Sequence, residues 1–241
     1  MPGRAHQGAP AGPSSTPPAA AFSGASAVGR DRWSNGGWRP RVALVCGNLA
    51  PTEDGVADYT VRLATALRGD VEPVLVTSGR LDVDVDVDTG PLPVVALGRG
   101  WGPTGLHATA QALRRLQPDV VHVQFAPSAF GFSPAPGLLP VLAGARAVWV
   151  ATLHEYGWWG WPSRLPSTLW RTAERRGWWD RETLTLVPRA RALVVTNPDH
   201  AATVHTRFGR TAQTVPVPAN IPHATPPASS APPAARAAAR G

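Results

Sequence analysis

Short, continuous apolar runs alternate with amphipathic segments through the middle of this chain. The runs occupy residues 41–46, 72–77, 92–97, 119–125, 147–153, 191–197 and 213–218. A run of this length bounded by turn residues is typical of a strand buried on both faces. Apolar residues at helical spacing fill 56–69, 105–117 and 198–208, and shorter helices are expected between 126 and 146 and within 167–189. We therefore predict an α/β, Rossmann-like domain: a parallel sheet with helices on both faces.

Both ends of the chain have a different composition. Residues 1–40 and 223–241 are rich in Pro, Ala, Gly and Ser and show no apolar period. Such segments bury too little surface to offset the entropy lost on ordering. We therefore predict a single domain over residues 41–222, flanked by disordered N- and C-terminal tails.

The basic residues argue against one class of partner. The formal net charge is +7, but all 23 basic residues are arginines, and they are spread along the chain without a long basic run. We therefore expect no nucleic-acid partner. The lone cysteine, Cys46, excludes an internal disulfide and lies in an apolar run, which favours a buried thiol over a nucleophile.

No apolar stretch approaches the roughly 20 residues that span a bilayer. The N-terminus also lacks the continuous apolar segment of a secretory signal, so the expected compartment is the cytoplasm.

Polar side chains follow several predicted strands, where parallel sheets bind their ligands. After the first strand, Gly55 opens a helix that carries Asp58 and Tyr59 one turn further on. Free N–H groups at a helix N-terminus attract anions, although an ordinary strand-to-helix turn has the same appearance.

The fourth and fifth predicted strands end in further polar groups. Gln124 closes the fourth strand, and His122 inside it is expected to be a core histidine with a satisfied hydrogen bond. His154 and Glu155 follow the fifth strand. A histidine at the mouth of the sheet is a candidate for binding a phosphate or a substrate hydroxyl.

The order of several short motifs resembles one enzyme family. The motifs are P-x-x-x-G-V-A-D-Y-T (51–60), D-V-V-H-V-Q-F (119–125), T-L-H-E (152–155), A-L-V-V-T-N (192–197) and V-P-V-P-A-N-I-P (215–222). Together they resemble the N-terminal half of family 4 glycosyltransferases, which have the retaining GT-B type of fold. The resemblance implies two Rossmann-like domains that face a cleft, the first binding the acceptor and the second a nucleotide-sugar.

The resemblance also implies roles for individual residues. Gly55 would lie near the donor diphosphate and the acceptor, although this chain has Asp54–Gly55 where family members usually show two glycines. His154 would reach the transferred sugar or its phosphate, and Asp58 and Tyr59 would lie on the acceptor side. The nucleotide-sugar would be a co-substrate, with no metal and no further cofactor.

The donor-binding domain that the resemblance implies does not follow residue 222. We therefore expect a truncated chain that is inactive or incomplete by itself and that needs a donor-domain partner. Glu174 and Glu182 have the E-x7-E spacing of the family's donor site, but they precede the sixth strand, and we interpret the match as coincidence. Asp84 and Asp86 imitate a metal-binding D-x-D motif within an alternating run at 83–88.

Residues 156–184 hold six of the ten tryptophans together with five arginines. Three interpretations stay open. Trp170 and Trp178 could pack helices onto the sheet; Trp158 and Trp159 could stack on the sugar rings of a substrate; or indoles and guanidinium groups could attach the chain to the inner face of a membrane.

The predicted function is the transfer of a sugar from a nucleotide-sugar to a hydroxyl acceptor, which could be a glycan, a lipid-linked sugar or a small molecule. The alternative is a non-catalytic α/β module that binds a glycan, a lipid carrier or a membrane surface.

Overall fold

The computed structural model describes residues 38–50, 54–81, 92–144, 146–160 and 166–217. All of its helices and strands lie in the unit Arg39–Gly241. The predicted tails, apart from residues 38–40, and the alternating segment at 83–88 lie outside the described residues. The domain boundaries drawn from composition therefore stay predictions.

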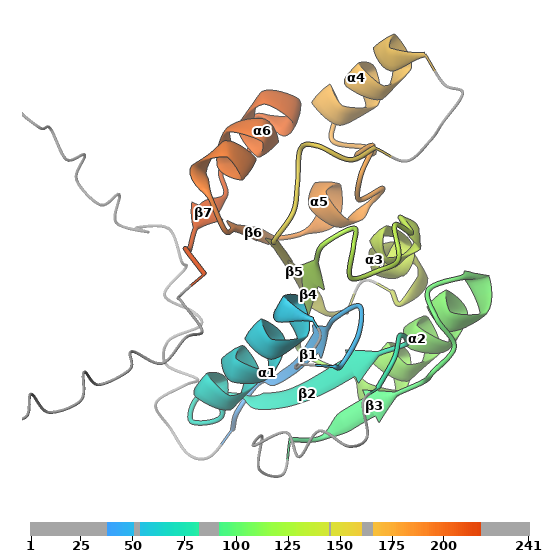
Figure 1. Ribbon diagram of the computed structural model, residues 1–241, viewed down its shortest axis with the longest axis vertical. Coiled ribbons are helices and arrows are strands. Elements are labelled where there is room, and N and C mark those ends of the chain that lie inside the picture. The colour runs from blue at the N-terminus through green and yellow to red at the C-terminus, as the bar shows by residue number, and fades with distance from the viewer. Residues whose placement is uncertain (1–37, 51–53, 82–91, 145, 161–165, 218–241) are drawn as a thin grey trace, which may run out of the picture. The chain divides into compact units, whose positions relative to one another are not determined.

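Seven parallel strands form one sheet in the order β3-β2-β1-β4-β5-β6-β7 (Figure 1). They are β1 (Arg41–Val45), β2 (Glu72–Thr77), β3 (Val94–Ala96), β4 (Val120–Phe125), β5 (Val148–Leu153), β6 (Ala192–Val195) and β7 (Gln213–Thr214). The predicted Rossmann-like sheet is confirmed. The first and last strands of this order are shorter than the apolar runs that predicted them, since an edge strand is paired on one side only.

The helices connect these strands, as Figure 1 shows. They are α1 (Gly55–Leu67), α2 (Pro103–Leu116), the 3-10 turn η2 (Ala135–Leu138), α3 (Leu139–Leu142), α4 (Ser167–Arg175), α5 (Leu186–Arg189) and α6 (Pro198–Phe208). Helix α2 begins two residues before the predicted segment, because a proline suits the first helical position. Asn197 caps α6 by accepting the N–H of His200, and Gly209 ends it with φ 64°.

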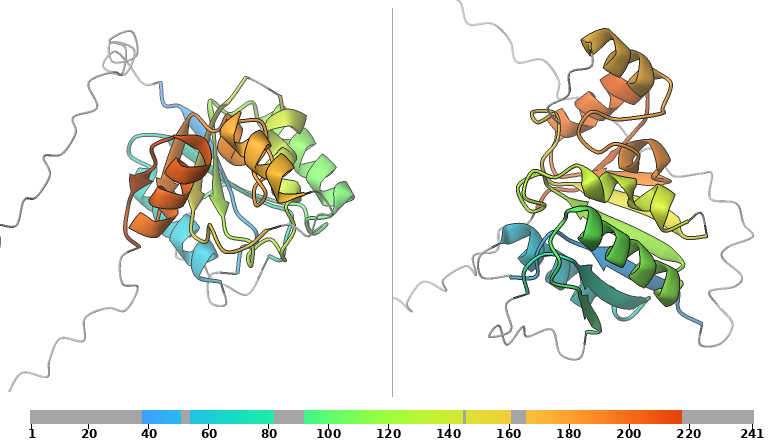
Figure 2. Two further views of the ribbon diagram at one scale, coloured as in Figure 1. Left: turned by 90° about the horizontal axis from the view of Figure 1, so that it is seen from above. Right: turned by 90° about the vertical axis from the view of Figure 1, so that its right-hand side faces the viewer.

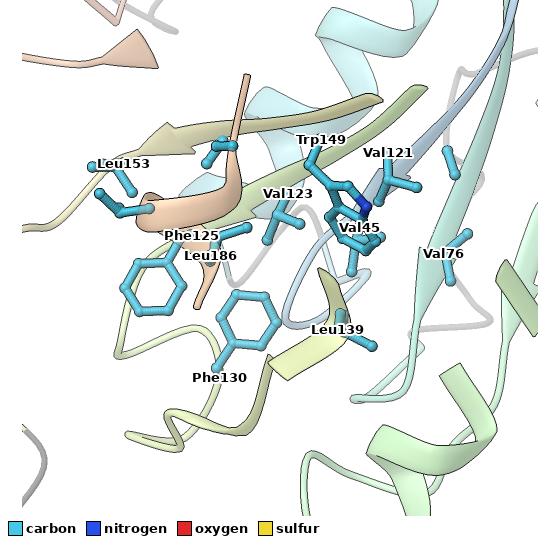
Figure 3. Close-up of a cluster of buried hydrophobic side chains, with 14 of the residues drawn as sticks. Val45, Val76, Val121, Val123, Phe125, Phe130, Leu139, Trp149, Leu153 and Leu186 are labelled. Carbon is cyan, nitrogen blue, oxygen red and sulfur yellow. The ribbon is translucent and has the colours of Figure 1, made fainter. Parts of the chain in front are cut away.

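Successive side chains of each strand point to opposite faces of the sheet. In β1, Ala43 and Val45 belong to the cluster that α2, α3 and α5 cover, whereas Val42 and Leu44 pack with Val61 of α1. Figure 2 shows helices flanking the sheet, and Figure 3 shows the larger cluster, in which Phe130 and Leu139 meet valines from several strands. Because both faces are covered, the strands are continuously apolar rather than alternating.

Cys46 belongs to the smaller cluster, under α1. Its side chain is fully buried, and burial raises the pKa of the thiol. The expectation of a buried, unreactive thiol is confirmed.

A buried ionic cluster joins α6 to the loop after β5. Arg207 donates to Glu182 at 2.6 Å and to Asp180 at 3.2 Å, and both carboxylates are fully buried. The Tyr156 hydroxyl also donates to Asp180, and the Gly157 N–H donates to Glu182 at 2.9 Å. Burial raises the pKa of both carboxyl groups; the Thr183 hydroxyl and Arg207 oppose this shift at Asp180, and Arg207 and the Gly157 N–H oppose it at Glu182.

Gly157 has no room for a side chain. Its φ is 99°, which only glycine adopts freely, and a Cβ would lie 3.1 Å from the Thr203 hydroxyl of α6. The loop after β5 therefore packs closely against α6 at Gly157, and the hydrogen bond to Glu182 holds the loop in this position.

Replacing Arg207 by methionine is expected to destabilise the fold by about 3–5 kcal/mol, because two buried carboxylates lose their counter-ion. Urea unfolding followed by circular dichroism measures the loss. The matched control is Arg62→Met, which removes the exposed pair with Asp58 on α1 and should cost less than about 1 kcal/mol. Equal losses in the two variants would contradict the assigned role of Arg207.

Candidate functional site

A cavity of about 660 Å³ lies where the strand order reverses, at the carboxyl ends of β1 and β4. This is the position at which open α/β sheets bind ligands. Loops after six of the seven strands and the first turns of α1 supply its lining: Asn48, Ala50, Asp54, Gly55, Val56, Tyr59, Arg80, Ser128, Ala129, His154, Glu155, Thr196 and Val217. We refer to this cavity as the switch-point pocket.

His154 is held in this pocket from two sides. Its Nε2 atom is hydrogen-bonded to Gln124 Oε1 at 3.0 Å, and the ring of Tyr59 meets it edge-on at 4.8 Å between centroids. Burial is the main cause that lowers the pKa of His154 to about 4; Asp54 opposes the shift and His200 adds to it. The ring is therefore neutral at pH 7, with Nε2 carrying the proton toward Gln124 and Nδ1 able to accept a hydrogen bond.

His122 lies in β4, and its Nε2 is hydrogen-bonded to the Thr152 hydroxyl of β5 at 2.8 Å. Burial, with a contribution from His154, lowers its pKa to about 4. It does not line the switch-point pocket. The expectation of a satisfied core histidine is confirmed.

The N-terminus of α1 is occupied by a side chain of the protein. The Asp54 carboxylate accepts the N–H groups of Val56 and Ala57 at 2.9 and 3.3 Å, as a helix N-cap does. The expectation that a ligand anion meets free N–H groups beside Gly55 is therefore wrong for these two groups. The Asp54 side chain thus lies at the position of the first of the two glycines that the resemblance implied.

Four of the predicted site residues line the pocket: Gly55, Tyr59, His154 and Glu155. Glu155 accepts a hydrogen bond from the Ser128 hydroxyl at 3.0 Å. Their assignment to substrate binding or catalysis stays a prediction.

The other four predicted residues lie elsewhere. Gln124 is fully buried and reaches the pocket only through His154. Asp58 forms an ion pair with Arg62 at 2.8 Å. Trp158 and Trp159 extend beyond the pocket lining, where both rings lie near Phe132, with centroids 6.3 and 6.4 Å from it.

Sequence reasoning missed several pocket residues. Asn48 connects three loops: it accepts the N–H of Arg80 at 3.0 Å, and its amide donates to Ala129 O at 3.2 Å and to Asp54 at 3.4 Å. Ser128 and Thr196 also line the pocket. All of these follow strand ends, so the rule that pointed to His154 would have found them had it been applied to every strand.

The E-x7-E match is explained by local ion pairs. Glu174 is buried and bonded to Arg181 by two contacts of 2.7 and 2.8 Å, while Glu182 is bonded to Arg207. Neither glutamate lines the switch-point pocket. Both carboxylates form ion pairs inside this domain, which agrees with the interpretation of the E-x7-E spacing as coincidence.

The packing interpretation of the tryptophan-rich stretch is wrong for Trp178, and Trp158 and Leu169 are exposed as well. The exposed fractions of Leu169, Trp178 and Trp158 are 54%, 57% and 61%. Trp170 is half-buried, and Trp161 lies outside the described residues.

Among the described residues, none of the helices has the length and apolar character needed to cross a membrane. The same residues contain no group of three or more His, Cys, Asp or Glu side chains placed to hold a metal ion.

A doubly wound α/β fold with an open pocket at its switch point defines a Rossmann-like ligand-binding domain. The model of Glycosyltransferase Family 4 matches residues 54–220, well over half of the chain, and the chain belongs to this family. The resemblance found in the motifs is thereby confirmed.

One solved structure similar to this chain is Anabaena HepE, crystallised in complex with UDP and glucose. The identity is 11% and the TM-score 0.47, over 74% of this chain and 44% of HepE. The chain therefore spans less than half the length of that protein. No match is found among the curated proteins.

The pH dependence of stability is expected to change when His122 becomes glutamine. Because folding lowers the pKa of His122 from 6.5 to about 4, this histidine binds more protons in the unfolded chain than in the folded one between these pH values. Stability is therefore lost as pH falls from about 6.5 to 4. The wild type should lose about 3 kcal/mol relative to H122Q over this range. Urea unfolding at several pH values measures the difference. The exposed His107→Gln variant should follow the wild type, and parallel curves for wild type and H122Q would contradict the prediction.

Replacing Asp54 by glycine is expected to let the pocket bind pyrophosphate at least about tenfold more tightly. The change frees the N–H groups of Val56 and Ala57 and removes a negative charge from the helix N-terminus. Isothermal titration calorimetry with inorganic pyrophosphate measures the affinity. Asp54→Asn keeps the cap without the charge and should give an intermediate value; equal affinity in all three proteins would count against a blocking role for Asp54.

Proposed function

We propose that this chain is the acceptor-binding half of a retaining glycosyltransferase, which transfers a sugar from a nucleotide-sugar to a hydroxyl group. Membership of Glycosyltransferase Family 4 supports the reaction class. The observation that carries the assignment of this half is the pairing of a neutral His154 with the capped N-terminus of α1 in one pocket.

The groups around the pocket suit a hydroxyl-rich molecule. Neutral His154 can accept a hydrogen bond from a hydroxyl, and Glu155 and Asn48 offer further oxygen acceptors. Tyr59 adds an aromatic side chain of the kind on which sugar rings rest. A hydroxyl acceptor held by several of these groups would be oriented toward the donor, which is the main way such a site accelerates group transfer.

The same pocket is poorly suited to a diphosphate. Asp54 places a carboxylate at the helix N-terminus and Glu155 adds a second, whereas His154 is neutral and Arg80 is the one positively charged side chain among the described residues of the lining. We therefore assign the donor diphosphate to a second domain, contributed by a partner chain or by a further segment of the protein. In this proposal the reaction takes place in the cytoplasm and needs no resident metal or cofactor beyond the nucleotide-sugar.

Two measurements test the proposal. The isolated chain, incubated with UDP-, GDP- and ADP-sugars and a panel of glycan acceptors, should release no nucleoside diphosphate above the uncatalysed rate. In the enzyme reconstituted with its donor domain, His154→Ala should lower kcat by about 100-fold or more, whereas His107→Ala, an exposed residue of α2, should leave it unchanged.

Robust turnover by the isolated chain would refute the need for a second domain. Absence of transfer by the reconstituted enzyme, combined with glycan binding by the isolated chain that His154→Ala abolishes, would favour the non-catalytic binding module instead.

A further inference from the structure

Five large apolar side chains are exposed on α4, on the segments before and after it, and on the loop after β4. We call Phe132, Trp158, Leu169, Trp178 and Trp179 the tryptophan surface; their exposed fractions run from 41% to 61%. Figure 1 shows α4 at the outer end of the molecule, beyond α5 and α6. Single exposed apolar residues need no explanation, but a gathering of large ones indicates an interaction site.

Hydrogen bonds and close packing hold two segments of this surface together. The Gly157 N–H donates to Glu182, and the Tyr156 hydroxyl donates to Asp180. A Cβ at Gly160 would lie 3.8 Å from the side chain of Arg181. Residues 156–160 therefore run beside residues 180–182. Trp158 belongs to the first of these two segments, and Trp179 directly precedes the second. Phe132 joins Trp158 edge-on at 6.3 Å.

The fold does not use these apolar side chains for its own packing. In α4 the only fully buried residue is Glu174, whose carboxylate is bonded to Arg181. The helix is thus held by an ion pair and by half-buried side chains, while Leu169 stays in solvent. Leu169 of α4 and the indoles of Trp178 and Trp179, just after the helix, are therefore available to a partner outside the domain.

The charge around α4 is positive. Arg171, Arg175 and Arg176 are exposed, and the guanidinium group of Arg176 lies 4.9 Å from the centre of the Trp178 ring. All of residues 166–179 are described, and the one carboxylate among them, Glu174, is buried and paired. Three exposed positive charges therefore border the indoles with no exposed negative charge in the same segment.

We propose that the tryptophan surface docks on an anionic lipid bilayer. Indoles lie at the depth of the headgroups, with the ring in the apolar boundary and the N–H in a polar layer. The three arginines would meet the headgroup phosphates. A nucleic acid would call for a longer run of positive charge along its phosphates, whereas here three charges border five large apolar side chains.

Docking at this surface brings the acceptor pocket close to the membrane. Trp158 follows His154 by four residues, and the contacts of Tyr156 and Gly157 with the ionic cluster fix the path between them. A lipid-linked hydroxyl acceptor would then reach the pocket without leaving the bilayer. The docking itself needs no transferase activity, so its failure and the failure of the proposed function are distinguishable.

Vesicle flotation with the full chain tests the proposal. The protein should float with vesicles made of equal parts phosphatidylglycerol and phosphatidylcholine, and should stay at the bottom with phosphatidylcholine alone. R171Q/R175Q should lower the partition coefficient by about 25-fold, since each arginine near the surface is worth roughly a fivefold factor. W158A/W178A should lower it by roughly tenfold or more.

A matched control separates this surface from net charge. R99Q/R115Q removes the same charge from exposed arginines at and before α2 and should bind as the wild type does. Urea midpoints should agree for all variants, because the altered side chains are exposed. Equal losses in R99Q/R115Q and R171Q/R175Q, equal binding to neutral vesicles, or tighter binding to a DNA oligonucleotide than to the anionic vesicles would overturn the proposal.

Discussion

All seven strands of this sheet run in the same direction, and the arrangement of the site depends on that constraint. Parallel pairing places every carboxyl end at one edge, so residues far apart in the sequence, such as Asn48, Ser128 and His154, converge on one pocket. The reversal of strand order at β1 then separates the neighbouring loops and opens the space between them. The pocket is thus a consequence of topology before any particular side chain is considered.

Side-chain contacts then fix loops that the sheet only brings near one another. Asn48 connects the loops after β1, β2 and β4, and a Cβ at Gly47 would overlap the carbonyl group of Ala129. On the other side, Arg207 and Glu182 hold the loop after β5 against α6. A buried ion pair of this kind adds little net stability over an apolar pair, but it accepts only one arrangement of its partners. We interpret both sets of contacts as the means by which the pocket keeps its shape.

The strands and helices could be predicted because they depend on local patterns. Apolar runs and helical spacing located nearly every element, and a proline, Pro198, stands at the predicted start of α6. The roles of the carboxylates could not be predicted in the same way. Glu174 and Glu182 have a spacing that imitates a ligand site, and only the structure shows that Glu174 pairs with Arg181, seven residues on, and Glu182 with Arg207 of α6.

The neighbourhood of Gly55 shows the same limit within the site. The sequence indicated a helix N-terminus after β1, and that is where α1 begins. Whether its N–H groups are free depends on the conformation of one preceding residue. Asp54 is extended, with φ −129°, which turns its carboxylate back onto the helix. A motif could therefore locate the site, but not the charge that a ligand would meet there.

The two proposals meet in the short segment from His154 to Trp158. Its first residue lines the pocket and its last belongs to the tryptophan surface, while Tyr156 and Gly157 between them are bonded to Asp180 and Glu182. Because the middle of the segment is fixed, neither end can shift freely with respect to the other. A membrane bound at Trp158 would therefore lie at a defined distance from His154. An acceptor anchored in that membrane would present its hydroxyl group at a constant height, and the fold would supply much of the positioning that transfer requires.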